Sequence, residues 1–187
     1  MTTPRIEGVG VVTHYSTQGD WAFDTAFQIA KSLGAQLNVY HFMTSPYESP
    51  LGISPSMVPS RDFCPKALAK AERFLREHYD ERLGDYLNVG FRLCANGRHN
   101  RELRRCLMRK EWQILILPYT ETGANFGGMP IEEFAYRFIS PLMLVGPDDP
   151  RQIRVNAAAM LVKDWLDSEV SAVTPIDQPT ELQMAPM

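Results

Sequence analysis

Two short apolar segments with one amphipathic helix between them open the sequence, and this order constrains the fold more than any other feature. The segments are residues 9–12 and 37–42, and the helical pattern covers residues 20–33. A helix in this position returns the chain to the same edge of a sheet, so the second strand lies parallel to the first. Because ligands of such sheets bind at the carboxyl ends of the strands, we expect function close to residues 13–16 and 41–42.

Composition excludes several classes of protein. The chain has 187 residues, of which 44% are hydrophobic and 22% charged, with a formal net charge of −3. Such a chain has no general attraction to nucleic acid or to an anionic membrane. Its three cysteines have no Cys-x-x-Cys spacing, and no apolar run reaches the ~20 residues of a membrane span. We therefore expect a cytoplasmic protein without disulfides, bound neither to nucleic acid nor to a membrane.

The remaining elements continue the alternation of strands and helices. Helical patterns start near residues 65 and 130, Leu103, Cys106 and Leu107 mark a further helix, and strand-like runs cover residues 87–93, 112–117 and 141–145. Residues 44–65 contain five prolines and are expected to form a long loop. The prediction is a five-stranded, parallel, doubly wound sheet of order 3-2-1-4-5, with helices on both of its faces.

The pattern changes after Gly146. Residues 147–150 read as a hinge, residues from about 154 to 170 as an amphipathic helix, and the rest as a flexible tail. We therefore expect one domain over residues 1–146 and a C-terminal extension over residues 147–187.

Three motifs of residues 6–146 resemble the universal stress protein family. The first strand ends in Thr13-His-Tyr-Ser16 where the family has Thr-Asp-x-Ser, and the second ends in His41-Phe42 where the family has His-Val. The third is Gly128, followed by Glu132 and by Pro141-Leu-Met-Leu-Val145. This resemblance implies the same fold, a homodimer paired through the last strand, and ATP or AMP as the ligand of those members that bind nucleotide.

The nucleotide motif of that family is degenerate in this chain. Pro118 and Glu121 occupy the places of two glycines, and Met129 replaces a hydroxyl donor. Proline removes an N–H group and glutamate brings negative charge toward phosphates. His14 stands where the family has the aspartate that contacts the nucleoside. The sequence therefore favours the fold without its ATP site.

Other chemistry finds little support in the sequence. His14, at a strand end, could sense protons or donate to a ligand, or it could be satisfied by the adjacent loop, whereas His41 reads as structural. A metal site of His14, His41 and Cys94 is disfavoured because the three would diverge on neighbouring strands. There is no Gly-x-Ser-x-Gly elbow and no Cys-His pair. Six basic residues against one glutamate over residues 98–110 form either a binding patch or a solvated helix face.

We therefore expect a non-enzymatic regulatory or stress-response module that dimerises and binds protein partners through its C-terminal helix or its proline-rich loop, without cofactor or metal. The alternative is an adenine-nucleotide sensor with a rebuilt pocket, or less favourably a nucleotide hydrolase. If a nucleotide binds, the expected contacts are Thr13, His14, Phe42, Gly127, Gly128 and Met129.

Overall fold

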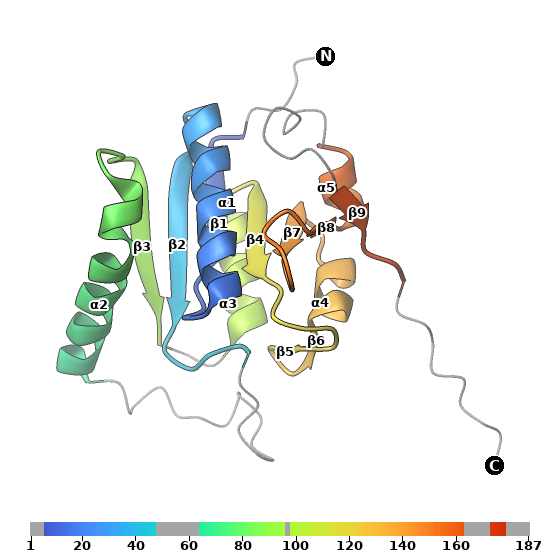
Figure 1. Cartoon of the computed structure of the whole chain (residues 1–187). Helices are drawn as coiled ribbons and strands as arrows, with labels where there is room; N and C mark the ends of the chain where they lie inside the picture. The colour runs from blue at the N-terminus through green and yellow to red at the C-terminus, as the bar shows by residue number, and fades with distance from the viewer. Residues whose placement is uncertain (1–5, 48–63, 96–97, 163–172, 179–187) are drawn as a thin grey trace, which may run out of the picture.

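A mostly parallel sheet between two helical layers forms the body of the protein, as the computed structural model shows (Figure 1). The structure describes residues 6–47, 64–95, 98–162 and 173–178. The first elements are β1 (Gly8–Val12), α1 (Thr17–Leu33), β2 (Gln36–Phe42), α2 (Pro65–Leu83), β3 (Val89–Cys94) and α3 (His99–Met108). They are followed by β4 (Ile114–Pro118), β5 (Asn125–Phe126), β6 (Met129–Pro130), α4 (Ile131–Arg137), β7 (Leu142–Val145), β8 (Ile153–Val155), α5 (Ala157–Met160) and β9 (Val173–Pro175).

The central sheet has seven strands rather than the predicted five. Its order is β3-β2-β1-β4-β7-β8-β9, which differs from the predicted 3-2-1-4-5 because β8 and β9 extend the sheet beyond β7. The pairs from β3 through β7 are parallel, while β8 is antiparallel to β7. The predicted α/β class with a parallel core is confirmed, and the strand count was wrong.

The C-terminal segment differs from the expected long helix. Residues 153–155 form β8, and the helix after them, α5, covers only Ala157–Met160. Residues 163–170 of the expected helix and residues 179–187 of the expected tail lie outside the described residues. Because β8 pairs with β7, the edge of β7 is not open, so the expectation of an open edge at Leu142–Val145 was wrong, while the homodimer itself stays a prediction.

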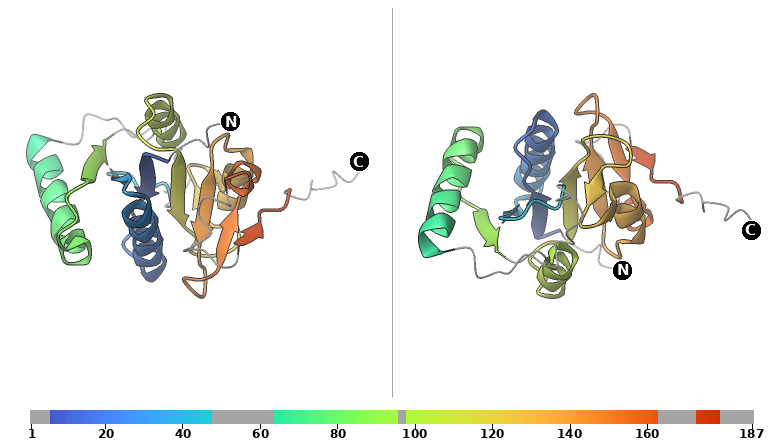
Figure 2. Two further views of the ribbon diagram at one scale, coloured as in Figure 1. Left: turned by 90° about the horizontal axis from the view of Figure 1, so that it is seen from above. Right: turned by 90° about the horizontal axis from the view of Figure 1, so that it is seen from below.

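Each face of the sheet carries its own hydrophobic core. Figure 2 shows the helices that cover the two faces. One core joins α1, α2 and α5 to the sheet, and the other joins α3 and α4 to the opposite face. β1, β4 and β7 are buried along their whole length, as expected for central strands. In the described part of the chain no helix is long and apolar enough to cross a membrane.

Helix boundaries follow local capping. α1 begins three residues before the expected Asp20, because the Ser16 hydroxyl accepts a hydrogen bond of 3.0 Å from the Gly19 amide. It ends at Leu33, where Gly34 adopts a left-handed conformation, as predicted. These boundaries place the loop 13–16 directly above the carboxyl end of β1, where function was expected.

Candidate functional site

The loop between β1 and α1 lies close against the first turn of α1. A side chain at Gly19 would collide with the carbonyl oxygen of His14, so glycine permits this close approach. The Nδ1 atom of His14 lies 2.8 Å from the Ser16 hydroxyl oxygen, and this hydrogen bond orients the His14 ring. Ser16 thus both caps the helix and positions the histidine at the strand end.

His41, at the end of β2, is held by the neighbouring strand. Its Nδ1 lies 2.9 Å from the hydroxyl of Thr13, which in turn donates to the carbonyl oxygen of Tyr40 at 3.2 Å. Desolvation by burial lowers the pKa of His41 below its ordinary value, so the ring is neutral at neutral pH. A neutral imidazole bonded in this way joins the end of β2 to the loop after β1.

A cavity of about 230 Å³ lies between the carboxyl ends of β1 and β2. The residues that line it are Thr13, His14, Tyr15, His41, Phe42, Met43, Ser45 and Pro46. Three of the six predicted contacts, Thr13, His14 and Phe42, are therefore together at one cavity. Its wall combines aromatic rings with hydroxyl and imidazole groups, and its volume is below the ~300–1,000 Å³ typical of small-molecule sites.

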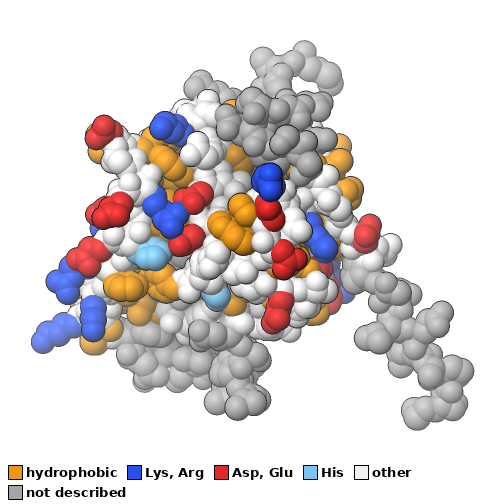
Figure 3. All heavy atoms as spheres, in the orientation of Figure 1, with side chains coloured by type: hydrophobic (Ala, Val, Ile, Leu, Met, Phe, Trp, Pro, Cys, Tyr) orange, Lys and Arg blue, Asp and Glu red, His pale blue; other side chains and the backbone are white. Residues whose placement is uncertain are grey.

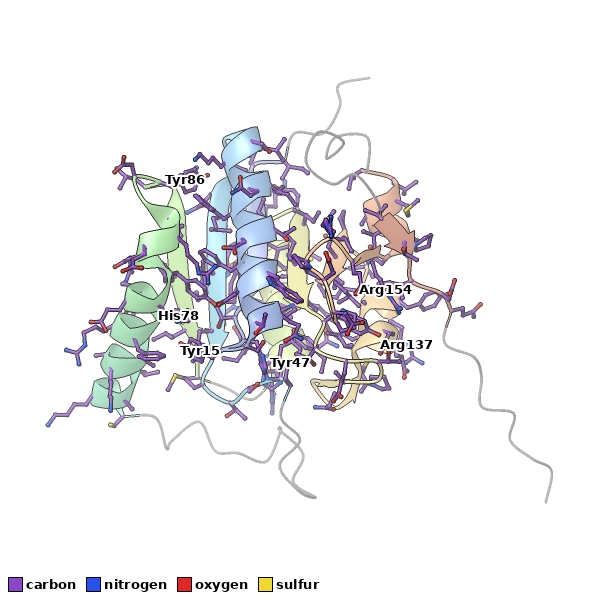
Figure 4. The ribbon with its side chains drawn as sticks, viewed as in Figure 1. Tyr15, Tyr47, His78, Tyr86, Arg137 and Arg154 are labelled. Carbon is purple, nitrogen blue, oxygen red and sulfur yellow. The ribbon has the colours of Figure 1, made fainter. Side chains whose placement is uncertain are left out.

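An aromatic cluster extends from this cavity to α2. The Tyr15 ring lies 5.4 Å from His41, 5.3 Å from Phe74 and 5.3 Å from His78, measured between ring centroids. Figure 4 shows Tyr15 and His78 approaching each other from the loop and from α2, and in Figure 3 hydrophobic side chains lie beside histidines on this face. Tyr15 and Phe74 are 44% and 55% exposed, so the cluster borders the cavity at the surface.

Polar side-chain contacts join α2 to α1 beside the aromatic cluster. His78 Nε2 lies 3.1 Å from a carboxylate oxygen of Asp20, and Arg82 contacts Asp20 at 2.8 Å and Asp24 at 2.7 Å. These partly exposed pairs contribute little stability individually, and the packing of Tyr79 on Phe23 in the core also joins the two helices. The aromatic cluster is thereby held against the loop after β1.

A second location, the crevice between the ends of β1 and β4, is filled by the chain itself. This is the point at which the strand order reverses and where doubly wound sheets bind their ligands. Tyr47 lies across it: its hydroxyl donates to the Pro118 carbonyl oxygen at 2.9 Å, and its ring lies 4.7 Å from His14 and 5.1 Å from Phe126. Burial raises the pKa of the Tyr47 phenol well above its ordinary value, so the hydroxyl stays protonated as a donor.

The turn at Gly127 and Gly128, which was expected to contact phosphates, is hydrogen-bonded to the loop after β2 that contains Tyr47. The Gly127 amide donates to the Pro46 carbonyl oxygen at 2.8 Å, and the Asn125 side chain donates to that oxygen at 3.2 Å. Gly127, Gly128 and Met129 belong to the β5–β6 hairpin and are not part of the cavity wall. The predicted nucleotide contacts are therefore divided between the cavity and the β5–β6 hairpin. Pro46 lines the cavity and is hydrogen-bonded to the hairpin.

The loop after β4 is stabilised by Glu132. Its Oε1 accepts hydrogen bonds from the Tyr119 hydroxyl at 2.6 Å and from the Gly123 amide at 2.8 Å. The Arg154 guanidinium lies over the Tyr119 ring, 5.1 Å from its centroid. Glu132 thus holds the turn at Gly123 against α4, and Pro118, at the end of β4, has no amide proton to offer a ligand.

Thiol and metal chemistry find no support in these positions. Burial raises the pKa of Cys94 to about 12 and that of Cys106 to about 11, so neither forms a thiolate nucleophile at neutral pH. Within the described residues, no three or more His, Cys, Asp or Glu side chains are grouped so that they could hold a metal ion.

Sequence reasoning did not assign Tyr47 a specific contact. The apolar side chains of loop 44–65, Tyr47 among them, were expected to form either a cover over the strand ends or a docking segment, and the structure places the Tyr47 ring in partly buried contact with His14 and Phe126. Leu51, Ile53, Met57 and Val58, expected to be exposed with it, lie outside the described residues. The sequence Ser45-Pro46-Tyr47 belongs to no periodic pattern, so it does not show where the tyrosine ring lies.

No protein-family model matches the chain, and the search of curated proteins found no match. Among solved structures, the chain is similar to "Universal stress protein UspA from Lactobacillus plantarum", with 14% sequence identity and a TM-score of 0.43, over 94% of this chain and 100% of that one. At this level of similarity the match carries no argument, so the family resemblance still rests on the three sequence motifs.

Proposed function

We propose that this chain is a non-enzymatic regulatory or stress-response module of the universal stress protein type, acting through protein partners. In this proposal residues 43–47 occupy the crevice where a nucleotide would lie. The observation that carries it is the pair of hydrogen bonds from Tyr47 to Pro118 and from Gly127 to Pro46. A ligand at this position would have to displace the ring of Tyr47 and compete for the Gly127 amide.

Titration calorimetry with ATP and Mg²⁺ tests the proposal. The wild-type chain should show no binding tighter than about 1 μM, which corresponds to roughly −8 kcal/mol. Tyr47→Ala should not create tight binding either, because Pro118 still has no amide proton and the Gly127 amide still donates to the Pro46 carbonyl oxygen. Sub-micromolar affinity in the wild type would contradict the proposal.

A second candidate is an adenine-nucleotide sensor with a rebuilt pocket. The observation that favours it is the 230 Å³ cavity, whose wall includes His14, Tyr15 and Phe42. Denaturing freshly purified protein and chromatographing the supernatant would reveal a tightly held nucleotide. If one is released, Tyr15→Ala should reduce the amount, whereas Tyr136→Ala, at a tyrosine of similar exposure on α4, should not.

A further inference from the structure

The outer face of α3 is strongly basic. Leu103 and Cys106 face the sheet, while Arg101, Arg104 and Arg105 are exposed. These positions are three or four residues apart, so their side chains form one surface with Met108, which is 79% exposed. Figure 2 shows α3 at the outside of the molecule, on the face of the sheet opposite α1.

Neighbouring carboxylates leave most of this charge uncompensated. Arg105 lies 3.7 Å from Glu102, a long contact, whereas Arg101 and Arg104 form no ion pair with any residue that the structure describes. Glu111, the acidic residue after the helix, is engaged by Arg92 at 2.9 Å and by the Tyr40 hydroxyl at 2.7 Å. The α3 surface is therefore positively charged although the whole chain has a formal net charge of −3.

We infer that this α3 surface, made of Arg101, Arg104, Arg105 and Met108, docks an acidic segment of a partner protein that also carries an apolar side chain. Guanidinium groups pair bidentately with carboxylates, and an exposed methionine is an adaptable apolar contact. This inference states what kind of protein partner the proposed function would use. The α3 surface is separate from the crevice that residues 43–47 fill, so the inference does not depend on whether a nucleotide binds there.

A protein segment fits this surface better than nucleic acid does. The exposed large apolar residue of α3 is a methionine, and no aromatic ring of this helix is exposed that could stack on a base. A duplex extends well beyond one helix of ten residues and would meet the negative charge on the rest of the chain. A short acidic segment can stay within the α3 surface.

Fluorescence anisotropy with three probes tests the inference on the full chain. The probes are a labelled Glu/Leu helical peptide of about 20 residues, labelled poly-Glu of the same length, and a labelled duplex of about 20 base pairs. The Glu/Leu peptide should bind most tightly, and its affinity should fall as salt is raised. Tighter binding of the duplex, or no binding of the peptide, would overturn the inference.

Variants then locate the surface. Arg101→Glu combined with Arg104→Glu should weaken peptide binding by at least about tenfold, whereas the equal charge change Lys66→Glu with Lys70→Glu, at exposed positions of α2, should weaken it by less than about threefold. Met108→Gln should weaken binding of the Glu/Leu peptide but not of poly-Glu. Equal losses in the α2 control, or no effect of Met108 on the Glu/Leu peptide, would refute the assigned surface.

Discussion

The hydroxyl of Tyr47 donates a hydrogen bond of 2.9 Å to the carbonyl oxygen of Pro118, across 71 positions of sequence. This contact joins the loop after β2 to the end of β4, over the point at which the order of the sheet reverses. The carbonyl oxygen of Pro46, one residue earlier, accepts a hydrogen bond from the Gly127 amide. A loop that would border a ligand in an open sheet is thereby part of the folded core.

Removal of the Tyr47 hydroxyl should lower stability measurably. Tyr47→Phe keeps the ring contacts with His14 and Phe126 but leaves the Pro118 carbonyl oxygen without this donor. The free energy of unfolding should fall by about 1 kcal/mol, the usual net contribution of such a bond. Urea denaturation measures the change, and Tyr136→Phe at an exposed site should leave stability unaltered. Equal stability of both variants would show that the hydroxyl bond contributes nothing.

Asn156 should be among the least replaceable polar residues. Its side-chain amide donates to the carbonyl oxygens of Ala135, Phe138 and Ser140, and its Oδ1 accepts from the amides of Leu142 and Ala159. Asn156→Ala should therefore cost about 3 kcal/mol or more of unfolding free energy, because buried groups lose their partners.

Asn156→Asp separates the two halves of this network. Aspartate keeps an acceptor for the two amides but places a carboxylate against three carbonyl oxygens, so it should be at least as destabilising as alanine at neutral pH. Gln28→Ala, at an exposed position of α1, should change stability by less than about 0.5 kcal/mol. A mild effect of both Asn156 variants in urea denaturation would contradict the assigned role of the side chain.

Regular periodicity explains why the parallel core could be predicted. The buried runs of β1 and β4, and the apolar face of α1, repeat over enough residues to be recognised. β8 could not be recognised, because its three residues are too few to show alternation. The apolar positions 155, 158, 159, 162 and 166 favoured a helix instead, and the pairing of β8 with β7 was decided by tertiary contact.

The candidate site was predicted only in part, for a related reason. Thr13, His14 and Phe42 follow strands, and the rule for parallel sheets brings such residues together. The contacts of Tyr47 depend on the path of a proline-rich loop, and those of Asn156 on the hairpin between β7 and β8. Neither path has a local sequence signal, so neither contact could be foreseen.

Stability should decrease as the solution is acidified from pH 7.5 to 5.5. Desolvation by burial lowers the folded-state pKa of both His41 and His99 below the ordinary value of about 6.5. Between the folded and the unfolded pKa the unfolded chain binds more protons, so the free energy of unfolding falls as pH falls through about 6.5, and this dependence ends below the folded pKa. Urea denaturation of wild type and His41→Gln should show a weaker pH dependence in the variant, and an identical dependence would exclude His41 as a contributor.

Truncation after Pro147 should expose the edge of β7. In the full chain this edge is paired with β8, from Met143 with Val155 to Val145 with Ile153. The truncated chain loses these bonds together with Asn156, so its thermal midpoint should fall by about 10 °C or more, and the open edge should promote self-association. Light scattering after size-exclusion chromatography would compare the two forms. A full-length dimer that pairs through β7 of each copy would require β8 to detach, which would contradict the pairing of β8 with β7. A truncated chain that stays monomeric and equally stable would show that β8 is dispensable for the sheet.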